Sequence, residues 1–95
     1  MQPWEAEGFE WDDENKRKIA RHHIWEWEVE EVFWNWPIWA PNKKGRAGDR
    51  LMVGETDGGR KLTIPVQVKP ITRQLRPITG WPSSQAELSK YGRRK

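Results

Sequence analysis

The chain has 95 residues with a net charge of +3, and it contains eight tryptophans and no cysteine. This length predicts one domain with a small core, in which the tryptophans are expected to fill much of the volume. The composition excludes disulfides, thiol nucleophiles and thiolate metal sites, and the absence of a signal peptide or a long apolar run predicts a cytoplasmic protein without membrane contact.

The first part of the chain predicts a flexible N-terminus over residues 1–8, followed by a short strand at Phe9–Trp11, where apolar and polar residues alternate. Asp12 is suited to cap a helix, with Asn15 three residues later. The helix is expected over residues 13–23, with a thin apolar face.

A second helix follows and is expected to end before Pro37, because the residue preceding a proline is pushed out of helical geometry. Its apolar stripe consists of Trp25, Val29, Val32, Phe33 and Trp36. We interpret these aromatic residues as core, with stacking on a base or sugar as the alternative.

Residues 37–49 are rich in proline, glycine and basic residues, so they predict a loop with a possible edge strand at Ile38–Ala40. Lys43, Lys44 and Arg46 in this loop are candidates for contact with phosphate groups.

Residues 50–68 predict a β-hairpin. Asp57-Gly58-Gly59 supplies the residues that tolerate a positive φ in a short turn. On the outgoing arm, apolar residues occupy every second position and therefore share one face: Leu62, Ile64, Val66 and Val68.

Residues 71–79 predict a third strand, in which Pro77 must lie at an edge or a bulge because it lacks an N–H. Ser84 and Glu87 have the spacing of a capping box, which predicts a short helix over residues 84–91. A basic, frayed tail is expected over residues 92–95.

These elements predict an α+β fold with two N-terminal helices on a small antiparallel sheet of three to four strands and a short C-terminal helix. A single domain over residues 9–91 is expected. Residues 1–36 contain ten Asp/Glu and four Lys/Arg, whereas residues 37–95 contain four Asp/Glu and thirteen Lys/Arg. The basic half suggests a polyanionic or acidic partner, although charged faces can also serve solubility alone.

The chain lacks a glycine-rich phosphate loop, a dinucleotide fingerprint and a nucleophile elbow, and its adjacent His22 and His23 have no metal-binding partner at usable spacing. We therefore expect no metal and no cofactor. Histidine and arginine suit cleavage of RNA through its own 2′-hydroxyl, which needs proton transfer and positive charge over the phosphate.

The chain resembles the BrnT family, the toxin half of bacterial type II toxin–antitoxin pairs. The resemblance covers residues 9–91 and rests on the order and spacing of several short segments. These are Trp11-Asp12, Arg21-His22-His23-Ile24, Val32-Phe33, Gly54-Glu55-Thr56-Asp57-Gly58-Gly59-Arg60-Lys61-Leu62, Arg76-Pro77-Ile78-Thr79-Gly80 and Tyr91.

The resemblance implies a metal-independent ribonuclease with a fold similar to the RelE-type toxins. It implies catalytic roles for His22 as general acid or base and for Arg50 and Arg76 as clamps on the scissile phosphate. Arg46 and Arg60, with Lys43 and Lys44, are the expected RNA-binding residues.

The expected partners are RNA and a co-encoded antitoxin, possibly of the ribbon-helix-helix type, through which oligomers would form. We expect the antitoxin to cover Arg46, Arg50 and Arg76. Trp81 stands where many relatives carry an arginine, and the terminal helix is less basic than in those relatives. A second interpretation is therefore a relative with weakened or absent catalysis that acts as a protein- or nucleic-acid-binding module.

Overall fold

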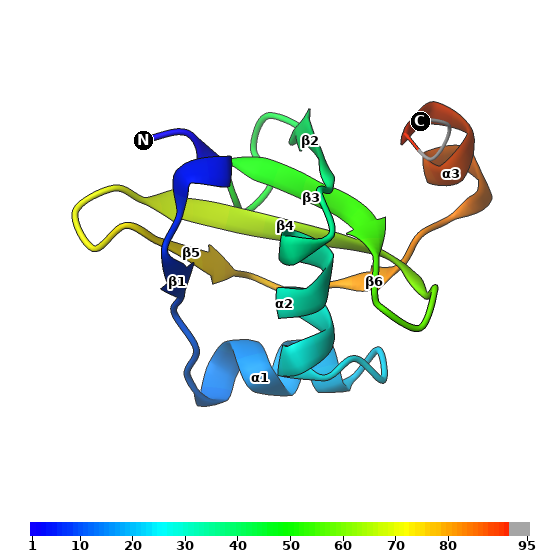
Figure 1. Ribbon diagram of the computed structural model, residues 1–95, viewed down its shortest axis with the longest axis horizontal. Helices are drawn as coiled ribbons and strands as arrows, with labels where there is room; N and C mark the ends of the chain where they lie inside the picture. The colour runs from blue at the N-terminus through cyan, green and yellow to red at the C-terminus, as the bar shows by residue number, and fades with distance from the viewer. Residues whose placement is uncertain (92–95) are drawn as a thin grey trace.

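The sheet is organised around the predicted hairpin, which a computed structural model describes together with the rest of residues 1–91 (Figure 1). Strand β3 (Arg50–Glu55) pairs antiparallel with strand β4 (Lys61–Lys69). In the connecting turn Gly59 has a φ of +87°, a conformation that residues with a Cβ rarely adopt. The prediction of a hairpin over residues 50–68 is confirmed.

Four more strands complete a six-stranded sheet in the order β1-β5-β4-β3-β2, with β6 paired to β4. They are β1 (Gly8–Phe9), β2 (Ile38–Pro41), β5 (Gln74–Pro77) and β6 (Trp81–Pro82). The α+β class is confirmed, but the expected sheet of three to four antiparallel strands is wrong. Six strands are present and β1 runs parallel to β5. The short strand predicted at Phe9–Trp11 is present as β1, one residue earlier, whereas β6 has only two residues, which is too short for an alternating pattern to show in the sequence.

Strand β5 is shorter than predicted, because Arg73 adopts a φ of +57° in the turn that precedes it. Pro77 lies at its end, opposite Val66 on β4. The N–H of Ile78 donates to the carbonyl of Pro65 at 2.9 Å, so the nitrogen of Pro77 faces away from β4. Strand β1 has already ended at this point, so the proline interrupts no pairing between strands.

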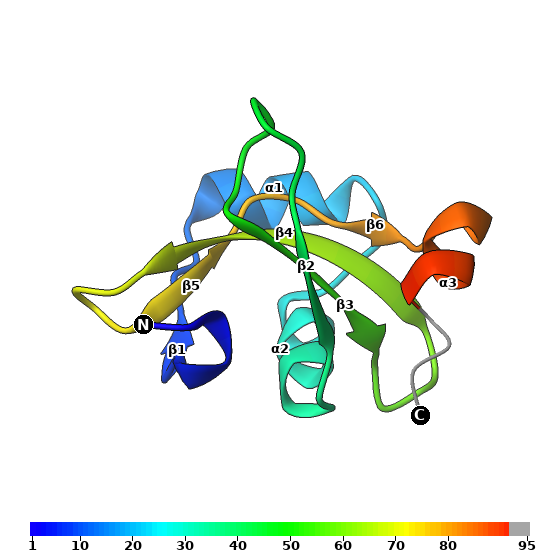
Figure 2. The same ribbon diagram turned by 90° about the horizontal axis from the view of Figure 1, so that it is seen from above.

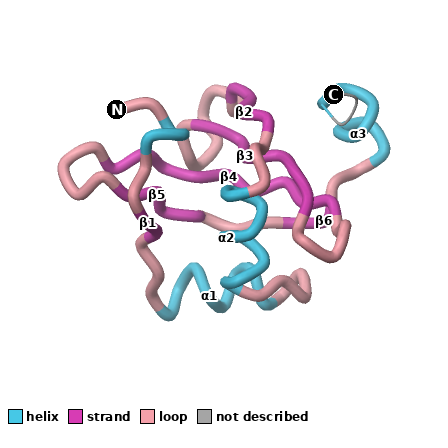
Figure 3. The backbone as a smooth tube through the Cα atoms, viewed as in Figure 1, coloured by secondary structure: helices cyan, strands magenta, loops and turns pink. Residues whose placement is uncertain are grey.

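Residues 1–91 contain three α-helices and one 3-10 turn, drawn together as helices in Figure 3. They are η1 (Pro3–Glu5), α1 (Asp13–Ala20), α2 (Glu26–Trp34) and α3 (Gln85–Tyr91). Both predicted caps form. The carboxylate of Asp12 accepts from the N–H of Asn15 at 3.0 Å, and the hydroxyl of Ser84 accepts from the N–H of Glu87 at 3.1 Å.

Helix α2 crosses one face of the sheet, and η1 lies on the same side (Figures 1 and 2). The loop between β2 and β3 projects on the side opposite α2, and α3 lies apart at the end of the sheet near β6. Gly54 allows α2 to come close to β3, because a Cβ at this position would meet Val32 and Pro37 at 3.2 Å. Helix α2 and η1 therefore lie on one side of the sheet, and the loop between β2 and β3 lies on the other (Figures 1 and 2).

The core is aliphatic, and the expectation that tryptophans fill it is wrong. Its most completely buried large side chains include Ile19, Met52, Leu62, Ile64 and Leu75. Five tryptophans are instead between 56% and 83% exposed: Trp4, Trp25, Trp27, Trp34 and Trp36. Trp25 and Trp36 lie just outside α2, so the helical period that predicted their burial does not set the direction of their side chains.

Buried Asn15 joins the start of α1 to the sheet. Its amide donates to the carbonyls of Glu10 and Pro77, both at 2.9 Å, and its side-chain oxygen accepts from the N–H of Asp12 at 2.8 Å. The asparagine therefore has a tertiary role beyond the predicted cap.

Near the N-terminus, Pro3 and Ala6 are buried and Glu7 pairs with Arg73 at 2.8 Å.

The predicted basic tail, residues 92–95, lies outside the described residues. Within residues 1–91, the helices are all too short and too polar to cross a bilayer.

Candidate functional site

His22 and His23 lie in the turn after α1 and not on the helix, which ends at Ala20. The N–H of Ile24 donates to the carbonyl of Ile19 at 3.1 Å and that of His23 to Ala20 at 2.9 Å, which is the hydrogen-bond pattern of a Schellman cap. His23 supplies the left-handed residue of this cap, with a φ of +60°. The imidazoles are exposed, and the predicted helix over residues 13–23 is three residues too long.

Arg60 connects this turn to the hairpin through hydrogen bonds. Its guanidinium donates to the carbonyls of His23 and His22 at 2.7 and 3.3 Å and pairs with the carboxylate of Glu28 at 2.9 Å. Glu28 also accepts from the N–H of Trp25 at 3.1 Å at the start of α2. The predicted RNA-binding residue Arg60 is therefore directed at acceptors of the protein itself.

Arg76 is surrounded by carboxylates. Its guanidinium lies 2.7 Å from Asp12, 3.1 Å from Glu10 and 3.4 Å from Glu14, and its side chain is 15% exposed. The hydrogen bond from Arg76 holds the pKa of the Asp12 carboxyl below its usual value, and the same bond raises the pKa of Arg76. A phosphate could reach this guanidinium only by displacing carboxylates.

Arg50 lies on a different face of the sheet from Arg76. Arg50 stands opposite Val66 and Arg76 stands opposite Gln67, and consecutive residues of β4 point to opposite faces. His22 is also remote from Arg50. Arg60 binds the backbone carbonyl of His22 next to the hairpin turn, where β3 ends, whereas Arg50 is the first residue of β3. Five residue steps of β3 span about 17 Å. The structure therefore does not bring the three predicted catalytic residues together, and their catalytic roles stay predictions.

The other predicted RNA-binding residues lie in the loop between β2 and β3: Lys43, Lys44 and Arg46. Arg50, which is predicted to be catalytic, begins β3 next to them. We call these four residues the basic loop. All four side chains are exposed, and within the described part of the chain none of them pairs with a carboxylate. The backbone around them is held in shape by two short side chains. The amide of Asn42 donates to the carbonyl of Ala47 at 2.7 Å, and the carboxylate of Asp49 accepts from the N–H of Val68 at 2.8 Å.

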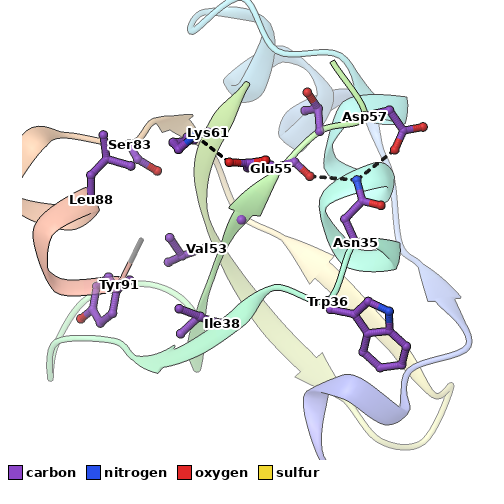
Figure 4. A pocket seen from close by; sticks show the side chains of 12 residues that line it. Asn35, Trp36, Ile38, Val53, Glu55, Asp57, Lys61, Ser83, Leu88 and Tyr91 are labelled. Atoms are coloured by element: carbon purple, nitrogen blue, oxygen red, sulfur yellow. Dashed lines mark hydrogen bonds and ion pairs between the residues drawn. The ribbon is translucent and has the colours of Figure 1, made fainter. Parts of the chain in front are cut away.

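A groove of about 520 Å³ lies between the end of α2, strand β3 and helix α3 (Figure 4). Apolar side chains of Ile38, Val53, Leu88 and Tyr91 line it, together with polar groups that already have partners. The ammonium of Lys61 pairs with Glu55 at 2.6 Å, and the amide of Asn35 donates to Asp57 at 2.9 Å and to the carbonyl of Glu55 at 3.0 Å. This groove offers no unpaired cation to a phosphate among the residues that line it.

Helix α3 is held to the sheet by Glu87. Its carboxylate accepts from the indole N–H of Trp81 at 3.1 Å, from the hydroxyl of Thr63 at 3.1 Å and from the N–H of Ser84 at 2.8 Å. Trp81, which stands where the resemblance implied an arginine, therefore positions α3 over one wall of the groove.

A second hollow, of about 160 Å³, was missed by sequence reasoning. Its walls are the side chains of Trp4, Phe33, Trp34, Trp36, Pro37 and Trp39, which together we call the tryptophan face. Phe33 lies edge-on to Trp34 with ring centroids 4.9 Å apart and to Trp39 at 6.1 Å. The composition of the sequence could have indicated this surface, because residues 1–11 and 24–41 contain seven tryptophans and seven glutamates but no lysine or arginine.

Trp36 is the most unusual member of this face. It follows the C-cap of α2 with a φ of +57°, a position where glycine is the common residue, and it is 83% exposed. A left-handed conformation costs a residue with a Cβ about 1–2 kcal/mol. Neither burial nor backbone preference accounts for a tryptophan here.

In the described residues 1–91, no three histidine, aspartate or glutamate side chains are grouped so as to hold a metal ion. Comparison of the chain with protein-family models, with curated proteins and with solved structures gave no match.

Proposed function

We propose that this protein binds RNA through the basic loop and cleaves it without a metal, as the toxin of a toxin–antitoxin pair of the kind that its sequence resembles. The observation that carries the proposal is that some cations of the protein are bound by its own carboxylates and others are not. Arg60 and Arg76 are each bound by carboxylates of the protein, whereas Lys43, Lys44 and Arg46 in the loop and Arg50 beside it pair with no carboxylate of the described residues. Arg50 donates only to the neighbouring carbonyl of Asp49, at 3.2 Å. Unpaired cations on one exposed loop suit contact with successive phosphates.

His22 is the proposed proton-transfer residue, because its imidazole is exposed to an incoming RNA and histidine is the residue type that most often serves as general acid or base. Cleavage uses the 2′-hydroxyl of the RNA, so DNA of the same sequence is not a substrate. Binding at the basic loop and proton transfer at His22 require an RNA that spans the sheet between them. A short oligonucleotide that reaches only one of the two places should be cleaved poorly.

A co-encoded antitoxin, for example one of the ribbon-helix-helix type, belongs to this proposal as the partner that silences the protein. An acidic segment of the antitoxin covering the basic loop would exclude RNA by competing for the same cations.

The experiment is cleavage of single-stranded RNA and matched DNA in EDTA. RNA should be degraded and DNA should stay intact. Replacing His22 with asparagine should lower the cleavage rate roughly 100-fold, the usual size of a lost general acid or base. His23→Asn is the matched control and should leave the rate nearly unchanged, since asparagine tolerates the positive φ at this position.

A second candidate function is an RNA-binding module without catalysis. The observation that favours it is that His22, Arg50 and Arg76 lie at three separate places. RNA that is bound but not cut, with equal and small effects of both histidine changes, would support this second function and contradict the first. Activity that is lost in EDTA and restored by a divalent ion would contradict the metal-free reaction.

A further inference from the structure

The tryptophan face exposes large apolar side chains around a hollow, although Phe33 at its base belongs to the core. The side chains of Trp4, Trp34 and Trp36 are 58%, 68% and 83% exposed, although each is large enough to contribute much to a core. Trp36 also holds a strained backbone conformation. Exposed apolar groups that gather around a hollow are typical of a binding surface.

The size of the hollow indicates what fits into it. Its volume is about 160 Å³, close to that of an apolar cavity of about 150 Å³ that holds one benzene molecule. Small-molecule sites are usually larger, about 300–1,000 Å³. The hollow therefore suits one side chain of a binding partner, anchored among aromatic rings.

The charge around this face indicates the sign of the partner. The two segments that build it contain seven glutamates and no lysine or arginine. Three of these glutamates pair with cations from elsewhere in the described chain, whereas the other four have no such ion pair: Glu5, Glu26, Glu30 and Glu31. Glu5, Glu30 and Glu31 accept hydrogen bonds from N–H groups of the protein, but no cation of the described chain neutralises their charge. Aromatic faces also attract cations, most of all at tryptophan.

The same charge opposes two other partners. Nucleic acid could stack its bases on tryptophan, but its phosphates would meet glutamates. An anionic membrane surface would be repelled for the same reason. A peptide that carries both basic and apolar side chains satisfies the aromatic hollow and the carboxylates together.

We propose that the tryptophan face binds a peptide segment of a partner protein that is both basic and apolar, with one of its side chains seated in the hollow. Helix α2, which supplies Phe33 and Trp34 to this face, lies on the side of the sheet away from the loop between β2 and β3 (Figure 2). The proposal is independent of RNA cleavage, because no residue of the face belongs to the predicted catalytic or RNA-binding set.

The test measures the binding of fluorescently labelled synthetic peptides to the full chain by anisotropy. A peptide of alternating leucine and arginine is the probe. A serine–arginine peptide of equal charge and a leucine–glutamate peptide are the controls. The leucine–arginine peptide should bind at least tenfold more tightly than either control, and its binding should weaken as salt is added.

Two matched double variants locate the site. Trp34→Ala with Trp36→Ala should lower the affinity of the leucine–arginine peptide at least tenfold. Trp25→Ala with Trp27→Ala removes two other exposed tryptophans that do not line the hollow, and should change affinity less than about twofold. Circular dichroism checks that both variants are folded.

Several outcomes would overturn the proposal. They are no binding of the leucine–arginine peptide, equal binding of the acidic peptide, or the same affinity in both double variants. Phosphatidylcholine vesicles bound more tightly than the peptide, and lost on changing Trp34 and Trp36, would assign the face to a neutral membrane surface instead. Self-association that depends on Trp36 and Lys44 together, without peptide binding, would assign it to the basic loop of a second copy.

Discussion

The tryptophan face and the basic loop differ in the chemistry of their exposed side chains. The first is apolar and acidic and is built from η1, α2 and β2, whereas the second is basic and projects from the loop between β2 and β3. Helix α2 and η1 lie on one side of the sheet, and the loop between β2 and β3 projects on the other (Figure 2). The first region suits cationic and apolar groups and the second suits anions, so we expect them to bind different partners.

Arg60 and Arg76 differ from the residues of these two regions in the contacts that they make within the protein. Arg60 and Arg76 each connect segments distant in sequence through several hydrogen bonds. Such contacts join α1, the loop before α2 and the sheet into one structure. The basic loop and the tryptophan face make few contacts of this kind, so changes there should alter binding far more than folding.

The largest expected effect separates the two regions by RNA binding. Changing Lys43, Lys44 and Arg46 together to glutamine should lower RNA affinity roughly 100-fold at low salt and flatten the dependence of affinity on salt, because phosphate contacts are lost. The Trp34→Ala, Trp36→Ala variant should bind RNA as the parent chain does. Filter binding or anisotropy over a series of salt concentrations measures both.

The control for this change removes the same amount of charge elsewhere. Lys16, Arg17 and Arg21 are exposed cations on or just after α1 without a carboxylate partner in the described chain. Their replacement by glutamine should weaken RNA binding much less. Equal losses in the two triple variants would mean that RNA responds to net charge and has no particular site on the basic loop.

A smaller effect is expected on stability at Trp36. Trp36→Gly should raise the free energy of unfolding by about 1 kcal/mol, because glycine adopts the left-handed conformation without strain. The same change should weaken binding of the leucine–arginine peptide. Urea unfolding followed by circular dichroism gives the first quantity and anisotropy gives the second.

Trp34→Gly is the matched control, since it also removes an exposed tryptophan but lies within α2. It should lower the free energy of unfolding by about 1 kcal/mol, because glycine is unfavourable in a helix. If Trp36→Gly were also destabilising, Trp36 would support the fold, and its exposure would no longer mark a binding surface.

The smallest expected effect concerns acid stability and sharpens the contrast between Arg76 and the basic loop. Because Arg76 lowers the pKa of Asp12 in the folded state, this interaction stabilises the protein above the ordinary pKa of 3.8. The stabilisation is lost as the pH falls through the lowered pKa. Arg76→Gln should therefore move the midpoint of acid unfolding to higher pH, measured by circular dichroism along a pH titration.

Arg73→Gln removes a more exposed ion pair, with Glu7, and should move the midpoint less. An unchanged acid transition in Arg76→Gln would show that the three carboxylates do not hold this guanidinium in solution. Arg76 would then be available to a phosphate, as the sequence predicts.

Local features of the fold were predictable from the sequence because neighbours within a few residues produce them. The Asp57-Gly58-Gly59 turn, the alternation along β4 and the caps at Asp12 and Ser84 all depend on such neighbours. The end of α2 before Pro37 has the same origin. These interactions leave a pattern that a single sequence displays.

The tertiary structure alone decided which tryptophans are exposed and where the arginines point. Arg76 reaches Glu10 across 66 positions of the chain and Arg60 reaches Glu28 across 32. The parallel pairing of β1 with β5 has a similar separation. No local spacing encodes such contacts, because they depend on how the helices return to the sheet. For the same reason, the sequence supplied the basic residues of a candidate site but could not predict which of them the protein itself would neutralise.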